Sequence, residues 1–267
     1  MINLIKASLF KLFKDRTFHI TAIVGGVLAI LLIGIRYLSK ECNGQSFFLN
    51  SLTPGSSFGL TIPINLIVFT VGEFTYGTVR NKIIAGISKA KVYIGLFITG
   101  LVFTFILAAA FSILTIGISS LIGGFNLESI GGSRFALSYV AYVVCSYIFV
   151  TALSIFFATI FRQIGGSNTI VIILLVFLSL LPLIIFSTMS SSGLSVEHWT
   201  MWINPIYMPG LYGNNVVSII TNIAGDSVGN LFYQSEKMIA AGIITPAYWT
   251  LLFFIGGLLI FKNSDVK

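Results

Sequence analysis

The sequence predicts an all-α integral membrane protein with six transmembrane helices, and two observations carry this prediction. Hydrophobic residues make up 56% of the 267 residues and charged residues only 9%, whereas a soluble domain carries about 25% charged residues. The apolar residues also form long continuous runs, which favour membrane-spanning helices over the alternating strands of a closed barrel. Residues 1–267 are expected to form a single transmembrane domain.

The first expected element is an amphipathic helix over residues 2–13. Its apolar residues recur at helical spacing, while Lys11 and Lys14 lie on the other side. Two arrangements remain open: a cytoplasmic extension of the first span, and an interfacial (elbow) helix that lies in the headgroup plane before the chain turns into the membrane. The basic face favours the interfacial helix.

Six apolar runs are long enough to cross a hydrocarbon core of about 30 Å. A tight turn over residues 162–168 separates the fourth run from the fifth. Residues 187–238 are too polar for a span but rich in Trp and Tyr, which predicts short extracellular or re-entrant helices at the outer interface, with a loosely ordered loop as the alternative. The spans are expected at approximately 18–38, 58–74, 92–122, 135–161, 169–186 and 239–261.

Lys and Arg are distributed unevenly between the two predicted sides. With the N-terminus in the cytoplasm, eleven of the 15 basic residues fall on the cytoplasmic side, as the positive-inside rule requires. Both termini are then cytoplasmic, in a multi-pass protein of the cell membrane. The net charge of +7 therefore reflects topology, and nucleic acid is excluded as a partner.

The sequence carries no pattern typical of a catalytic or metal site, so we expect no enzyme activity, no metal ligands and no cofactor bound by this chain. It has no G-x-x-x-x-G-K-[ST] loop for nucleotide phosphates. The histidines, His19 and His198, are predicted at opposite membrane faces. The spans are almost free of charge, which argues against proton- or sodium-driven transport. The exception is Glu73, near the cytoplasmic end of the second span, where it is either a hinge or docking residue or an interfacial carboxylate paired to a nearby Arg or Lys.

The most informative stretch is VGEFTYGTVRNKIIAGISKAKVY, residues 71–93. Its mixture of basic and apolar residues between Gly77 and Gly86 predicts a short cytoplasmic helix between the second and third spans, and a solvated basic loop is the alternative. The stretch closely resembles the cytoplasmic loop of ABC-2 type ABC transporter permeases, G-E-x-x-x-G-T-[IV]-R-N-K. The matching residues are Gly72, Glu73, Gly77, Thr78, Val79, Arg80, Asn81 and Lys82.

This resemblance implies a permease subunit of an ATP-driven ABC exporter. Two such subunits, identical or related, would form the translocation path, and a separate ABC ATPase subunit would hold ATP and Mg. In that family the loop is a coupling helix that docks in a cleft of the ATPase, with basic residues supplying charge complementarity and apolar residues the packed anchor. The coupling residues expected here are Glu73, Tyr76, Gly77, Arg80, Asn81, Lys82, Ile83 and Gly86.

Uncharged spans favour an amphipathic or apolar substrate that leaves by way of the membrane lipid, and the resemblance suggests a peptide antibiotic, a toxin-like peptide or a lipid. Thr61, Asn65 and Ser179 are candidate residues of the substrate path, with hydrogen bonding between helices as the alternative role. A function from another class also remains open, namely a non-transporting membrane scaffold or sensor that docks a cytoplasmic partner through the basic loop.

Overall fold

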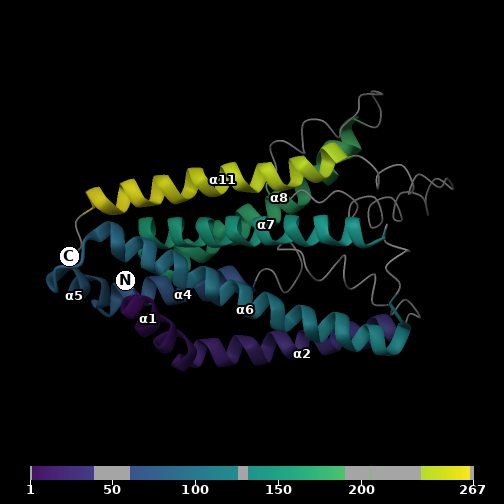
Figure 1. The fold of residues 1–267 in the computed structure, drawn as a ribbon, viewed down its shortest axis with the longest axis horizontal. Coiled ribbons are helices and arrows are strands. Elements are labelled where there is room, and N and C mark those ends of the chain that lie inside the picture. Colours follow the sequence, from purple (N-terminus) through teal and green to yellow (C-terminus); the bar gives the residue numbers. More distant parts are fainter. Residues whose placement is uncertain (1, 39–60, 126–131, 190–204, 206–235, 265–267) are drawn as a thin grey trace.

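The computed structural model describes residues 2–38, 61–125, 132–189, 205 and 236–264. Within these ranges every regular element is a helix and no strand occurs (Figure 1), so the predicted all-α class is confirmed for this part of the chain. The helices are α1 (Ile2–Lys14), α2 (Arg16–Leu38), α4 (Thr61–Thr75), α5 (Thr78–Ile84), α6 (Lys89–Gly123), α7 (Gly132–Phe161), α8 (Ile164–Met189) and α11 (Glu236–Asn263).

Four segments among the described residues are long and apolar enough to cross a membrane: Phe18–Ile35, Lys89–Gly123, Tyr139–Phe161 and Ile243–Asn263. They coincide with the first, third, fourth and sixth predicted spans. A fifth candidate arises only if α4 and α5, which are bent by 54° from each other, count as one span.

The second and fifth predicted spans are less complete. α4 has 15 residues, and residues 58–60 of its predicted span lie outside the described residues. In α8 the apolar segment Ile164–Leu178 is too short to count as a candidate span. Most of the predicted outer segment, residues 190–204 and 206–235, also lies outside the described residues, so six spans and an outer cap stay predictions.

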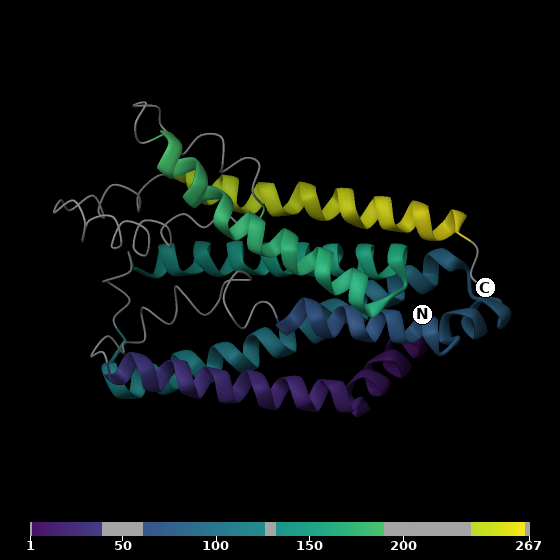
Figure 2. The same cartoon turned by 180° about the vertical axis from the view of Figure 1, so that it is seen from behind.

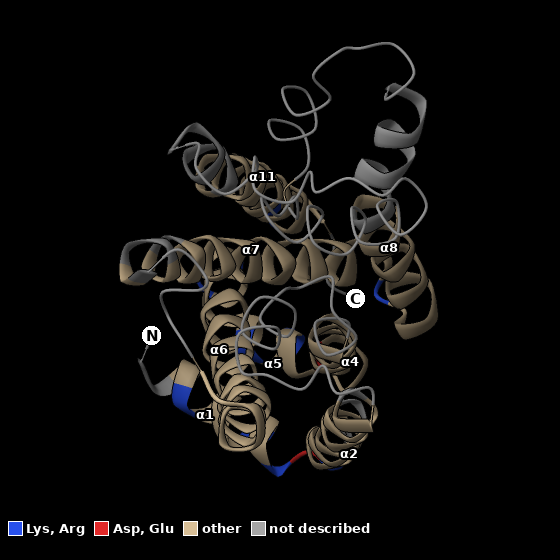
Figure 3. Cartoon of the chain, turned by 90° about the vertical axis from the view of Figure 1, so that its right-hand side faces the viewer, with Lys and Arg blue, Asp and Glu red and all other residues tan. Residues whose placement is uncertain are grey.

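α7 is the central helix of the bundle. Of its candidate span, 67% is buried inside the protein, against 17 to 28% for the other three. It contacts α4, α6, α8 and α11 and lies between α11 on one side and α4 and α6 on the other (Figures 1 and 3). Most residues of the other candidate spans are only partly buried or exposed, as in helices that border lipid.

The turn between α7 and α8 is shorter than predicted, because only residues 162 and 163 are non-helical. Gly165 and Gly166, which suggested a loop, lie in the first turn of α8. The break falls instead at Arg162, whose φ is 51° and whose guanidinium lies 5.4 Å from the centre of the Phe74 ring. Figure 2 shows α8 leaving this turn and crossing α7 obliquely.

Both chain ends and α5 lie at one end of the bundle (Figure 1), which we call the basic end. Only two acidic residues, Asp15 and Glu73, belong to it among the described residues. Ten basic residues belong to the helices and turns of this end. They are Lys6, Lys11, Lys14, Arg16, Arg80, Lys82, Lys89, Lys91, Arg162 and Lys262.

Glycines allow several helices to approach one another closely. A methyl group added at Gly25 would collide with the ring of Phe111, which holds α2 against α6. At Gly100 of α6, the added carbon would lie 3.0 Å from Ile155 on α7 and 3.3 Å from Leu66 on α4. Small residues at helix contacts are typical of packing between membrane-spanning helices.

We expect Gly100→Leu to destabilise the protein by about 1 to 3 kcal/mol, since a larger side chain would overpack the contact between α4, α6 and α7. Gly117→Leu is the matched control on the same helix, because Gly117 is exposed and has nothing within 4 Å of the added carbon. Thermal unfolding in detergent micelles measures both. Equal shifts for the two variants would contradict close packing at Gly100.

Candidate functional site

α5 is a separate helix of seven residues with a glycine in the left-handed conformation beyond each end. Gly77, with φ +67°, turns the chain out of α4, and its N–H donates to the Phe74 carbonyl at 3.0 Å. After α5, Gly86 has φ +85° and donates to Ile83 O at 2.9 Å, while the N–H of Ile87 donates to Lys82 O at 3.1 Å. This pair of bonds is a Schellman motif, which closes a helix and favours glycine at its left-handed position.

Glu73 lies in the last turn of α4 and is fully buried. Its two carboxylate oxygens accept hydrogen bonds from different lysines: Lys11 Nζ lies 2.6 Å from Oε1, and Lys82 Nζ lies 2.6 Å from Oε2. Lys11 belongs to α1 and Lys82 to α5. The carboxylate therefore ties three helices together at the basic end.

Two hydroxyl groups complete this cluster. Lys82 Nζ also donates to Ser8 Oγ on α1 at 3.3 Å, and Lys11 Nζ donates to Thr78 Oγ1 at the start of α5 at 3.2 Å. Each lysine thus contacts both Glu73 and the helix that carries the other lysine. We call Ser8, Lys11, Glu73, Thr78 and Lys82 the three-helix joint.

The joint combines a buried anion with cations that keep some contact with water. The side chain of Glu73 is 1% exposed, whereas those of Lys11 and Lys82 are 42% and 16% exposed. Removing a carboxylate from water costs several kcal/mol. A well-placed pair of cations offsets this cost but adds little net stability to the fold. The joint therefore acts mainly by fixing which helices meet and how they are oriented.

The opposite side of α5 faces outward. Tyr76 is 78% exposed and Ile84 is 73% exposed, and Arg80 and Asn81 are also exposed. Lys11 Nζ lies 5.6 Å from the centre of the Tyr76 ring, which limits the positions available to this side chain. We call Arg80, Asn81 and Ile84, together with Tyr76 in the turn that precedes the helix, the outer face of α5.

The residues predicted to couple to a partner thus fall into two groups. Tyr76, Arg80, Asn81 and Gly86 are exposed. Glu73 and Lys82 form the ion pair inside the chain, Ile83 packs against the hydrophobic core, and Gly77 is half-buried at the start of α5. The outer face includes Ile84, which the sequence reasoning did not select although it follows Arg80 at helical spacing. Lys11 was not selected either, since it is 62 residues away from Glu73.

A second set of contacts at the basic end holds the end of α11. Lys89 Nζ donates to the carbonyl oxygens of Lys262 and Ser264 at 3.3 and 2.8 Å. Arg162 donates to Ser264 Oγ at 2.8 Å. A cation at the last carbonyls of a helix interacts favourably with the helix dipole, so the start of α6 and the α7–α8 turn both anchor α11.

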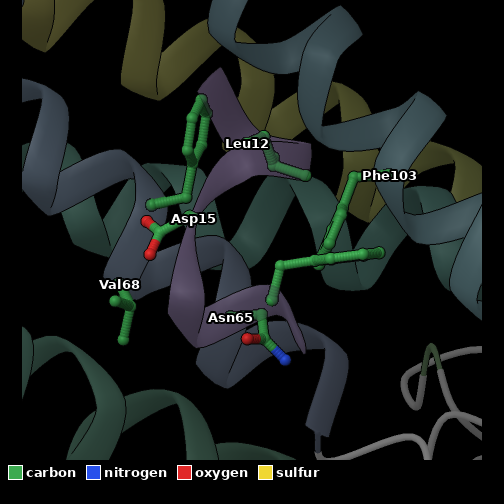
Figure 4. A pocket seen from close by; sticks show the side chains of 7 residues that line it. Leu12, Asp15, Asn65, Val68 and Phe103 are labelled. Carbon is green, nitrogen blue, oxygen red and sulfur yellow. The ribbon is translucent and has the colours of Figure 1, made fainter. Parts of the chain in front are cut away.

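One of the predicted path residues of α4, Asn65, borders a small pocket. Asn65 is buried and its Nδ2 donates to the Thr61 carbonyl at 2.8 Å, a bond within the helix. The pocket lies between α1, α2, α4 and α6, with room for about one water molecule (Figure 4). Ser179 belongs to α8, and its side chain lies outside those described. The pocket is lined by Leu12, Asp15, Phe18, Asn65, Val68, Phe69 and Phe103.

The described residues hold no group of three or more His, Cys, Asp or Glu side chains that could bind a metal ion. Glu73, the most buried carboxylate at the basic end, is already paired with two ammonium groups. Its arrangement is that of a structural ion cluster beside an exposed helix face, and the chemistry available there is docking of another molecule.

We expect Glu73→Gln to loosen α5, because the amide leaves one lysine facing an NH2 group at the joint. The free energy that holds α5 in place should fall by about 1 to 2 kcal/mol, less than for a fully buried pair, because both lysines reach water. Trypsin should therefore cleave α5 after Arg80 roughly five to thirty times faster.

Lys91→Gln is the control for Glu73→Gln, because Lys91 is an exposed lysine at the same end of the molecule. Its cleavage rate at Arg80 should match that of the unmodified protein. A cleavage rate unchanged by Glu73→Gln would show that the ion cluster does not hold α5 in place.

Comparison of the chain with protein-family models, with curated proteins and with solved structures finds no match. Its function therefore has to be inferred from its own residues and from the motif resemblance in residues 72–82.

Proposed function

We propose that this chain is the permease subunit of an ATP-driven ABC exporter and that α5 docks in a separate ATPase subunit. The observation that carries the proposal is the outer face of α5. This short helix stands at the basic end and belongs to the stretch that matches the permease motif. Ile84 in the helix and Tyr76 in the turn before it are both exposed. Aromatic, aliphatic and Arg side chains on one rigid patch are typical of binding hot spots.

The proposed topology has six spans and places the basic end in the cytoplasm, with both termini. Ten Lys and Arg residues against two acidic residues at that end support this orientation through the positive-inside rule. The opposite end of the described helices carries only Arg36, Arg134 and Lys237 as basic residues. An ATPase in the cytoplasm would then meet α5 directly.

ATP and Mg would be bound by the ATPase, since the chain has no phosphate-binding loop. Movement of the ATPase would push on α5, and the three-helix joint would pass this displacement to α4 and α1. α4 contacts the central helix α7, so a change in the tilt of α4 would shift the packing of α7 in the middle of the bundle. Two permease subunits, identical or related, would open a path between them toward the outside.

The proposed substrate is amphipathic or apolar, such as a peptide antibiotic, a toxin-like peptide or a lipid. The described candidate spans carry no Asp, Glu, Lys, Arg or His near their middle, which supports a substrate that makes few charged contacts. Thr61, Asn65 and Ser179 stay candidates for the path, with hydrogen bonding inside the bundle as their competing role.

The proposal is tested by purifying the tagged chain from its native membrane. We expect a protein with a G-x-x-x-x-G-K-[ST] loop to co-purify and to hydrolyse ATP, and the chain alone to hydrolyse none after trace ATPases are removed. A stable cytoplasmic partner without a nucleotide site would favour the scaffold or sensor function instead.

Two adjacent isoleucines separate docking from folding. Ile84→Ala should weaken binding of the ATPase by about 1 to 2 kcal/mol, as truncation of a hot-spot side chain does, and should leave thermal unfolding unchanged. Ile83→Ala should mainly lower stability, by about 1 to 2 kcal/mol, because Ile83 packs against the core.

Pull-down of the ATPase and thermal unfolding are measured for both isoleucine variants. Arg80→Ala should reduce binding in a salt-dependent way, because it removes an exposed charge that would steer association. If both Ile84→Ala and Arg80→Ala bound the ATPase normally, the outer face of α5 would be excluded as the docking site.

The orientation is tested on the two ends of α6 in a protein with Cys42 and Cys145 replaced by Ser. A cysteine introduced at Phe125 should react with an impermeant maleimide on intact cells, and one at Ser88 only after permeabilisation, because the Lys and Arg bias puts Ser88 inside. The reverse pattern would invert the topology, and equal reaction from outside would show that α6 does not cross the membrane.

A further inference from the structure

The side of α1 that points away from the bundle carries a short basic and aromatic stripe. Lys6, Phe10 and Lys14 follow one another at intervals of four residues, so they lie within an arc of about 80°. All three are exposed, and Phe10 is 70% exposed. Ser8 and Leu12, on the opposite side of the same helix, are buried.

α1 is fixed at the level where the first span begins. It contacts α2 and α6, and a side chain at Gly95 of α6 would collide with Leu4 of α1. Only Asp15 separates α1 from α2, whose membrane-spanning segment starts at Phe18. α1 runs obliquely along the flank of the bundle (Figure 1), so its outer stripe lies beside the bundle, next to the start of the first candidate span.

The stripe has a charge of one sign. Within residues 2–38 the only acidic residue is Asp15, and it borders the pocket shown in Figure 4. Lys14 Nζ lies 5.8 Å from the centre of the Phe10 ring, so the aromatic ring and the charge are neighbours on the surface. Two lysines that flank an exposed aromatic ring fit an interface between acyl chains and negative headgroups.

We propose that the Lys6–Phe10–Lys14 stripe binds anionic phospholipid. The two ammonium groups contact headgroup phosphates, and the Phe10 ring enters the boundary between headgroups and acyl chains. A zwitterionic headgroup offers a phosphate but also a cation, so the stripe distinguishes anionic lipid from phosphatidylcholine by net charge.

The bound lipid also has a route to α5. Lys11, on the adjoining side of α1, bonds Glu73 and Thr78, and Glu73 bonds Lys82 on α5. Anionic lipid that holds α1 at the interface therefore also holds the helix that presents the outer face. This second step rests on the proposed function, whereas lipid binding by the stripe does not.

The test uses the purified full chain in detergent, without any ATPase. Displacement of a pyrene-labelled phosphatidylglycerol by unlabelled phosphatidylglycerol or phosphatidylcholine measures the preference for anionic lipid. Replacement of Lys6 and Lys14 together by Gln should weaken phosphatidylglycerol binding by about fivefold for each lysine lost and leave phosphatidylcholine binding unchanged. Phe10→Ala should weaken the binding of both lipids.

The control removes the same charge from the same end: Lys91 and Lys262 together replaced by Gln, both exposed lysines outside α1. It should retain the preference for phosphatidylglycerol, and thermal unfolding checks that every variant is folded. Equal losses in the two double variants would overturn the proposal, because the lipid would then respond to general charge only. No preference for phosphatidylglycerol in the unmodified chain would overturn it as well, and neither result depends on whether an ATPase binds α5.

Discussion

A carboxylate removed from water at the end of an apolar helix has to meet positive charge, and in this chain two lysines from different helices meet it. Glu73 brings α1, α4 and α5 together through Lys11 and Lys82. Other arrangements of these helices would leave a buried carboxylate or its lysine partners without compensation, which costs several kcal/mol. The ion cluster therefore selects one arrangement of the basic end over its alternatives.

The rest of the described bundle is held by a different kind of contact. Its spans meet at glycines and at hydroxyl groups such as those of Thr104 and Thr151, whose oxygens lie 2.9 Å apart between α6 and α7. Hydroxyls of this kind also bond the carbonyl four residues earlier, as Thr151 does to Tyr147, and so stay satisfied without a partner helix. Close packing selects the arrangement of the helices in the interior, and the three-helix joint selects it at the basic end.

Much of the helical layout could be predicted from the sequence, because the length and hydropathy of a span are local properties. α2, α6, α7 and α11 were located in this way, and so was α5 between its two glycines. The turn between α7 and α8 begins at Arg162 as predicted but is shorter. The contacts of Arg162 with Phe74 and Ser264, which lie far away in the sequence, cannot be predicted from the local pattern.

The site was predictable in composition but not in orientation. The stretch around Glu73 was recognised, but helical spacing alone does not say which side of a seven-residue helix faces the bundle. Ile83 and Ile84 are adjacent and chemically identical, yet Ile83 packs against the core and Ile84 is 73% exposed. The ion pair of Lys82 with Glu73 fixes the rotation of α5, so that Ile83 faces the core and Ile84 faces outward. The contact of Lys11 with Glu73 could not be predicted, because it depends on how α1 lies beside the end of α4.

A helix as short as α5 would not be stable alone in water, so the membrane domain has to supply its conformation. Gly77 and Gly86 fix where it begins and ends, and Lys82 fixes which side turns inward. A partner that binds its outer face therefore meets side chains that are already ordered, which lowers the entropic cost of association. In the proposed exporter the same rigidity serves transmission: a force on α5 cannot be absorbed by bending at a flexible loop alone, because Glu73 and Lys11 carry it into α4 and α1.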